Sequence, residues 1–183
     1  MAEEENRSEK AESRQPETDA PQVQNTPADS TENELEHMFF GSYDHSIDGK
    51  GRIIIPAGYR DALGDRFTIG PTRDLQAVAL YPRHVWLKLL KEFQSMNQRK
   101  LQVQQYIHQF TKLSYPDGES DNQGRLLLPS KLRSRMLGEA KDVEISGAFD
   151  HIRIVDSQRA AKEDQDFLEN IPELLQYLGD LEA

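Results

Sequence analysis

The sequence predicts an α+β protein with a mainly β core, organised as two copies of a ββαββ unit with a helical hairpin between them. The prediction depends first on a motif that recurs in register. One copy contains Asp48-Gly49-Lys50-Gly51-Arg52, followed by three apolar residues and Pro56. At a constant offset of 73 positions, Asp121-Asn122-Gln123-Gly124-Arg125 is again followed by three apolar residues and Pro129. Two copies indicate a fused pair of half-domains, because a solenoid needs at least about three repeats.

The first half of each copy reads as two strands joined by a tight turn. Residues 39–47 predict a strand that contains Gly41. The glycines of 49–51 predict the turn, because glycine adopts positive φ at low steric cost. The unbroken apolar run that follows Arg52 predicts a short strand over 52–55 that is buried on both faces.

The second half of the first copy adds a helix and two more strands. Pro56 suits the start of a helix over 57–63, and Gly64 suits its C-cap. Apolar residues at 67–69 and 77–81 predict two strands around a loop.

Two amphipathic helices separate the copies. Pro82 opens the first, in which apolar residues recur with the i, i+3, i+4, i+7 spacing of one helix face, at Trp86, Leu89, Leu90 and Phe93. Met96-Asn97 ends that helix, and the same spacing returns at Val103, Tyr106, Ile107 and Phe110. The pattern predicts a helical hairpin.

The second copy ends in strands at 142–146 and 151–155, after which Asp156-Ser157 supplies the N-cap of a final helix with an apolar side. Pro172 interrupts that apolar side. The predicted segments are an acidic leader (1–36), a first unit (38–84), the helical hairpin (85–111), a second unit (112–156) and a C-terminal helical tail (157–183). Because an isolated hairpin is marginal in water, each unit must complete the core of the other.

The net charge of −10 is unevenly distributed. Residues 1–36 carry 11 acidic and 3 basic side chains, and residues 156–183 carry 8 acidic and 2 basic ones. Residues 37–155 carry 17 basic and 13 acidic side chains, so a basic centre between acidic ends permits binding of a polyanion. The leader is also poor in apolar residues, which predicts disorder.

Several classes of protein are disfavoured by the sequence. It has no cysteine, so disulfides and thiolate metal sites are excluded. No run approaches the 18 or more apolar residues of a membrane helix, which predicts a soluble, cytoplasmic protein. The histidines lack metal-ligand spacing, and no nucleotide-binding loop or nucleophile motif occurs. We therefore expect no metal, no cofactor, no small-molecule substrate and no enzyme activity.

These features resemble the MraZ family of bacterial transcription regulators over about residues 38–160. The resemblance is carried by Met38-Phe39-x-Gly41, the two D-x-x-G-R-x-x-x-P motifs at 48–56 and 121–129, Leu80-Tyr81-Pro82 and Ser95-Met96-Asn97. It implies a pseudo-two-fold double swapped-hairpin barrel of the AbrB/SpoVT type that assembles into closed rings. It also implies binding to promoter repeats of the division and cell-wall gene cluster, mostly as a repressor acting at the nucleoid.

The resemblance also implies a site. The DNA-contacting candidates are Lys50, Arg52, Arg60, Arg125 and Arg133, and the residues that shape the turns are Asp48, Gly49, Gly51, Asp121 and Gly124. The sequence departs from the family pattern at Phe40, where an arginine is usual, and at Asn122-Gln123, where no lysine occurs. The first departure predicts the loss of one basic contact, and the second predicts two unequal halves.

Other interpretations of these residues remain open. Arg52 and Arg125 can instead pair with the aspartates of their own turns, which contributes only about 0–1 kcal/mol at a surface. Lys50 can be a solvated loop residue, and Arg60 and Arg133 can be surface charges. At the level of the whole chain, the alternative is an antitoxin-like interaction module that binds a protein partner through its acidic C-terminal tail.

Overall fold

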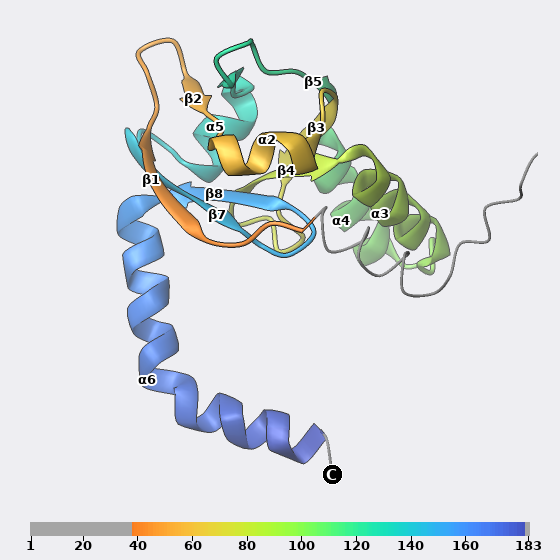
Figure 1. Cartoon of the computed structure of the whole chain (residues 1–183). Helices are drawn as coiled ribbons and strands as arrows, with labels where there is room; N and C mark the ends of the chain where they lie inside the picture. The colour runs from red at the N-terminus through yellow and green to blue at the C-terminus, as the bar shows by residue number, and fades with distance from the viewer. Residues whose placement is uncertain (1–37, 182–183) are drawn as a thin grey trace, which may run out of the picture.

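The computed structural model describes residues 38–181 (Figure 1). The predicted acidic leader lies outside the described residues. The elements follow the predicted order, and their bounds are β1 Ser42–Ser46, β2 Arg52–Ile54, α2 Ala57–Leu63, β3 Phe67–Pro71, β4 Val78–Pro82, α3 Arg83–Ser95, α4 Leu101–Lys112, β5 Tyr115–Gly118, β6 Arg125–Leu127, α5 Ser130–Met136, β7 Asp142–Gly147, β8 Ile152–Asp156 and α6 Ser157–Leu181.

The strands form a six-stranded antiparallel sheet in the order β1-β7-β8-β4-β3-β5 and a separate two-stranded ribbon of β2 and β6. The first strand of each copy pairs with the third strand of the other copy, β1 with β7 and β5 with β3. The last strands, β4 and β8, join the two halves at the centre. Exchanging the copies leaves this order unchanged, so the sheet has the pseudo-two-fold symmetry that the repeated motif predicts.

The pairing within the ribbon shows which residues lie at the pseudo-two-fold axis. Ile53 lies opposite Leu126, the residue 73 positions later. On either side, Arg52 lies opposite Leu127 and Ile54 lies opposite Arg125. The two copies of the motif are therefore paired antiparallel at their own equivalent residues.

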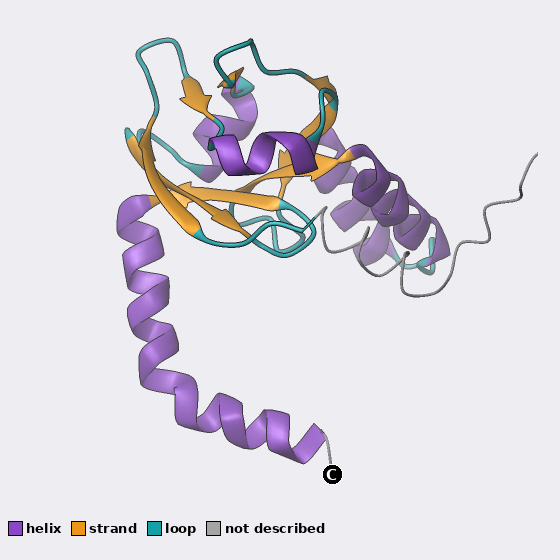
Figure 2. Ribbon diagram, viewed as in Figure 1, coloured by secondary structure: helices purple, strands orange, loops and turns teal. Residues whose placement is uncertain are grey.

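The main core contains residues from both copies. In β4, Val78 and Leu80 face a cluster that includes side chains of α2, α5 and the ribbon. Ala79 and Tyr81 face the opposite side, where α3 and α4 pack over the sheet. Because its side chains alternate between these two clusters, β4 is buried on both faces. The helical hairpin extends beyond the end of the sheet (Figure 2).

Two expectations about the β structure are wrong. Residues 38–181 form an open sheet and a ribbon and contain no closed barrel, because β2 and β6 pair with each other and not with an edge strand of the sheet. The apolar run of the ribbon is also not buried on both faces. Ile53 and Leu126 are buried at 1% exposure each, whereas Ile54 is 44% and Leu127 is 60% exposed. The ribbon covers the core with one face only.

The helix ends follow the predicted local chemistry. Gly64 adopts φ 78°, and its N–H donates to the carbonyl of Arg60, which confirms the C-cap of α2. The Asp156 carboxylate accepts a hydrogen bond from the Gln158 N–H at 3.1 Å and caps α6. The helix α6 is continuous from Ser157 to Leu181 and contains Pro172. Figure 1 shows the axis of α6 bending along its length, as expected for a helix with an internal proline.

Within residues 38–181, none of the helices combines the length and the apolar character that crossing a membrane requires.

Two adjacent isoleucines in the ribbon allow a test of its one-sided packing. We expect Ile53→Ala to lower the free energy of unfolding by about 2–5 kcal/mol, because it leaves a cavity at the pseudo-two-fold axis. Ile54→Ala should lower it by about 1 kcal/mol or less, since Ile54 points away from the core. Urea denaturation followed by circular dichroism measures both. Equal losses of stability for the two variants would contradict the one-sided packing of the ribbon.

Candidate nucleic-acid interface

The two turns that lead into the ribbon have the same hydrogen-bond pattern. The Asp48 carboxylate accepts from the N–H groups of Lys50 and Arg52, both at 2.9 Å. The Asp121 carboxylate accepts in the same way from Gln123 and Arg125, again at 2.9 Å. Each aspartate therefore shapes its turn through side-chain to backbone bonds, the structural role expected of it.

These bonds stabilise the ionised aspartates. The pKa of Asp48 is lowered to about 2, chiefly by the backbone N–H of Arg52 and next by the hydrogen bond from the Arg52 side chain. The pKa of Asp121 is also lowered, chiefly by the backbone N–H of Arg125, and the positive charge of Arg52 contributes. The electrostatic influence of Arg52 on Asp121 means that the two turns lie near each other.

The arginines at the two strand starts differ in their pairing. Arg52 donates from Nε to the Asp48 carboxylate at 2.7 Å, and a second guanidinium nitrogen lies 2.7 Å from the same oxygen. The exposed Arg125 side chain makes no hydrogen bond or ion pair with any residue of 38–181, although its charge helps to lower the pKa of Asp121. The pairing alternative thus describes Arg52, while the Arg125 guanidinium is available to a ligand.

Both arginines lie on the outer face of the ribbon. Side chains alternate between the faces of a strand, so the burial of Ile53 and Leu126 directs Arg52 and Arg125 away from the core. The two are diagonal neighbours across the strand pair, about 7–8 Å apart on average for such positions. Figure 1 shows both turns on the same side of the molecule, above the sheet.

Arg60 and Arg133 lie on the helices that follow the ribbon, and each contacts the glycine of the opposite turn. A Cβ built on Gly124 would overlap the Arg60 guanidinium, and one built on Gly51 would overlap that of Arg133. Both glycines also have positive φ, 76° and 82°. Arg60 is held by a 2.9 Å hydrogen bond from its Nε to the Ile55 carbonyl. The two arginines therefore connect each copy to the turn of the other.

Two further basic residues lie on α5 and do not belong to the repeated motif. Lys131 and Arg135 are exposed, and the 73-residue offset aligns them with Gly58 and Ala62 in the first copy. Position 123 of the second turn lacks the lysine that the first turn has at position 50. The second copy thus carries additional positive charge on its helix. Aligning the helices of the repeats, and not only their turns, would have found this difference.

Phe40, one of the departures from the family pattern, is 60% exposed and lies outside the turns. Its ring packs edge-to-face on Phe149, with centroids 6.0 Å apart. The aromatic ring therefore belongs to a contact with the β7–β8 hairpin.

In residues 38–181, no three histidine, aspartate or glutamate side chains come together in a group that could hold a metal ion. The ribbon and its turns offer guanidinium and ammonium donors, which bind anionic oxygens.

The fold and the site define an internally duplicated α+β protein with an exposed arginine-bearing ribbon. Comparisons with known proteins identify its family. Residues 38–106 match the family described as "MraZ protein, putative antitoxin-like". The chain is 32% identical to a transcriptional regulator MraZ of Lachnoclostridium phytofermentans over 78% of its own length and 98% of the relative's. It is also 32% identical to that of Leuconostoc citreum, over 79% and 99%. With the protein of Halothermothrix orenii the identity is 38%, over 67% and 83%.

The chain belongs to the MraZ family of transcriptional regulators.

The lowered pKa of Asp48 gives a prediction about pH. Its carboxyl titrates near 3.9 when unfolded and near 2 when folded, so the ionised form stabilises the fold above about pH 4. That contribution is lost as the pH falls through 2. We expect the stability advantage of the native protein over Asp48→Asn to be largest above pH 4 and to shrink toward pH 2. Urea denaturation at a series of pH values measures it. An NMR titration midpoint of Asp48 near 3.9 would contradict the assignment.

The contact between Gly124 and Arg60 gives a second prediction. Gly124→Ala should lower the free energy of unfolding by about 1–3 kcal/mol, since it combines a left-handed backbone with displacement of Arg60. Gly49→Ala is the matched control, because no heavy atom lies within 4 Å of its added Cβ. Arg60→Ala in the Gly124→Ala background should restore part of this stability. Strict additivity of the two changes in thermal unfolding would show that the residues are not coupled.

Proposed function

We propose that this protein is a DNA-binding transcriptional regulator whose DNA-contacting surface is the outer face of the β2–β6 ribbon with its two turns. One observation carries the proposal. Antiparallel pairing of the two motif copies brings Arg52 and Arg125, 73 residues apart in the chain, to the same exposed face. Membership of a family of transcriptional regulators supports it.

The geometry of the ribbon suits duplex DNA. The major groove admits a two-stranded β-ribbon, and arginine binds the O6 and N7 atoms of guanine through its two parallel donors. Ile54 and Leu127 lie beside the arginines and are exposed at 44% and 60%. Apolar side chains at such positions contact the methyl group of thymine. An outer face of two arginines and two aliphatic side chains can therefore distinguish base pairs.

Each candidate residue has a proposed role. Arg52, oriented by Asp48, and Arg125 read or neutralise the DNA, and Lys50 contacts a phosphate from the tip of the first turn. Arg60 and Arg133 add positive charge and hold the turns through Gly124 and Gly51. The aspartates and glycines fix the backbone that positions these side chains.

The strand exchange supports a finer description of the fold. We propose that the units 38–84 and 112–156 form a double swapped-hairpin of the AbrB/SpoVT type, with the hairpin 85–111 inserted and the tail 157–183 appended. The pairing of β1 with β7 and of β5 with β3 is the exchange that such a fold requires.

We also propose that the protein acts at the nucleoid as a ring-shaped homo-oligomer on promoter repeats of the division and cell-wall genes, mainly as a repressor. Each subunit offers a small basic surface. Several linked subunits on successive repeats gain an effective-concentration advantage of about 10²–10⁴ in overall binding. Avidity would compensate for the few cations of each site.

An antitoxin-like interaction module remains the second candidate. It is favoured by the apolar side chains exposed along α6 and by the description of the matching family as antitoxin-like. Under this alternative, α6 binds an unrelated protein with fixed stoichiometry, and removal of the Arg52 and Arg125 side chains has no effect on that complex.

The DNA proposal predicts that removing the side chain of either Arg125 or Arg52 weakens DNA binding. Arg125→Ala should weaken binding to the protein's own upstream DNA by about tenfold or more, because its guanidinium has no competing partner in residues 38–181. Arg52→Ala should also weaken binding, and the slope of log K against log salt should fall by about 1 for each phosphate that a subunit no longer neutralises. Fluorescence anisotropy over a salt series measures both.

Arg99→Ala is the control for these variants, since Arg99 is an exposed arginine in the connection between α3 and α4, away from the ribbon. It should leave both affinity and slope unchanged. Unchanged binding by the double variant Arg52→Ala, Arg125→Ala would remove the ribbon from the DNA interface.

A further inference from the structure

The helix that follows the last strand is packed differently in the two copies. α3 begins directly after β4 and α6 directly after β8, 74 positions later. In α3 the side chains of Val85, Leu89 and Phe93 are buried in a cluster with β4 and with Phe110 of α4. The equivalent helix of the second copy has no such cover among residues 38–181, so its apolar side is left without the partner that its counterpart has.

Only the first turns of α6 are attached to the sheet. Arg159 pairs with Glu163 at 2.8 Å and also bonds to the carbonyl of Gln76, while Glu163 pairs with Arg153 of β8. Beyond these contacts the helix extends away from the body, on the side opposite the two turns (Figure 1). Large apolar side chains are exposed along this part, namely Phe167, Leu168, Leu174, Leu175, Tyr177 and Leu178, at 39% to 66%.

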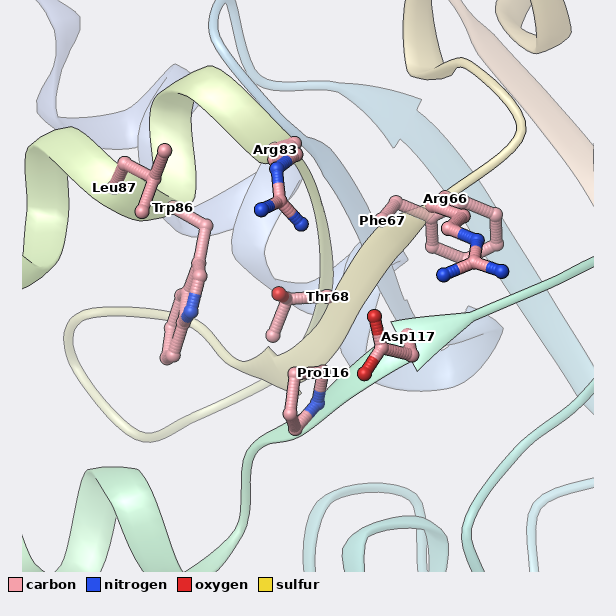
Figure 3. A pocket seen from close by; sticks show the side chains of 8 residues that line it. All are labelled: Arg66, Phe67, Thr68, Arg83, Trp86, Leu87, Pro116 and Asp117. Atoms are coloured by element: carbon pink, nitrogen blue, oxygen red, sulfur yellow. The ribbon is translucent and has the colours of Figure 1, made fainter.

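A complementary surface lies on the outer side of α3. Arg83, Leu87 and Lys91 occur at i, i+4 and i+8 and are all exposed, with Leu87 at 47%. Next to this stripe, Figure 3 shows a hollow between α3 and the sheet, with the guanidinium group of Arg83 above it, the Trp86 ring on the left, and Arg66 and Asp117 on the right. Its volume is about 200 Å³. That is below the roughly 300–1,000 Å³ of small-molecule sites, so it suits a side chain better than a cofactor.

We propose that the exposed stripe of α6 docks on the α3 face of a second copy of this chain, with one of its apolar side chains in the hollow. The inference rests on the self-association part of the proposed function and names the surfaces involved.

The charges beside the α6 stripe indicate which surface of a second copy it binds. α6 carries acidic residues beside its stripe, among them Glu169 and Glu173, and has no lysine or arginine after Lys162. Pairing α6 with the α6 of a second copy would bring like charges together. The α3 face presents Arg83 and Lys91 beside Leu87. At the hollow, Arg66 pairs with Glu119 at 3.6 Å and Asp117 also lines the wall, so the positive charge that complements α6 comes from Arg83 and Lys91, and Leu87 complements its apolar side.

The donor and acceptor surfaces are different, so the contact is heterologous. Each copy gives its α6 to one neighbour and receives an α6 from another, and such contacts generate a ring when the rotation closes. The two turns lie on the side away from α6 (Figure 1), so this contact leaves the ribbon free for DNA.

Disulfide trapping in the full chain tests the contact, because the sequence contains no cysteine. Two differently tagged chains, one with Leu87→Cys and the other with Leu175→Cys, are co-expressed and mildly oxidised. We expect a mixed disulfide between the two tags as the main product. Replacing Leu87→Cys by Ile54→Cys is the matched control, since Ile54 is about equally exposed at 44% but lies on the ribbon.

Two results would overturn the proposal: a mixed product no more abundant than with the Ile54→Cys control, or a predominant disulfide between two Leu175→Cys chains. The second would establish α6–α6 pairing instead.

Charge-matched variants test the contact independently, with self-association measured by mass photometry or sedimentation. Leu175→Glu should raise the dissociation constant for self-association at least about 30-fold, whereas Gln176→Glu, which adds the same charge at the neighbouring exposed position, should change it little. Arg83→Glu should weaken association and Arg99→Glu should not. Wild-type behaviour of Leu175→Glu, or an unrelated protein bound to α6 in place of a second copy, would contradict the inference.

The DNA proposal is judged separately from this one. If Leu175→Glu is monomeric but still binds a single DNA repeat with the salt dependence of one wild-type subunit, the docking is supported and the ribbon is unaffected. If the trapping fails while Arg125→Ala still weakens DNA binding, only the docking is wrong.

Discussion

The pairing of β2 with β6 is the interaction on which the rest of this structure depends. It joins the two copies of one motif at equivalent residues, Ile53 and Leu126, and buries both. Because side chains alternate along a strand, burying these two residues turns the arginines on either side outward. Packing of the core and presentation of the cationic surface thus follow from the same strand register. A shift of one residue would bury the arginines and expose the apolar side chains.

Duplication has also allowed the copies to diverge where symmetry is not required. The turns keep their hydrogen-bond pattern, since the aspartate and the positive-φ glycine are needed in each. The charges around them differ, with Lys50 in the first turn and Lys131 and Arg135 on α5 of the second copy. The divergence is greatest after the last strands, where α3 is covered by a partner helix and α6 is not. The two turns thus share one geometry, while the helices that follow the last strands differ.

Much of the fold follows from local patterns. The in-register motif, the helix spacing of Trp86 to Phe93 and the capping residues Gly64 and Asp156 predict the elements and their order, because these signals depend on neighbours in the chain. The same reasoning places Arg52 and Arg125 at strand starts. It fails for Ile54 and Leu127, whose exposure depends on the ribbon having a single covered face. It also assigns no partner to Arg60 and Arg133, because Gly124 and Gly51 lie in the other copy, far away in sequence.

Local sequence patterns are enough to predict two equivalent units, a turn with an aspartate and a following arginine in each, and a helical hairpin between them. Periodicity and turn chemistry are local properties, and a constant offset reveals the repeat without coordinates. Three features depend on the folded chain as a whole: each unit pairs its first strand with the other unit, the sheet is open, and both arginines lie on one face of the ribbon. Those outcomes depend on which strands pair across the chain, and long-range pairing is decided by the burial of a common core and not by any single segment.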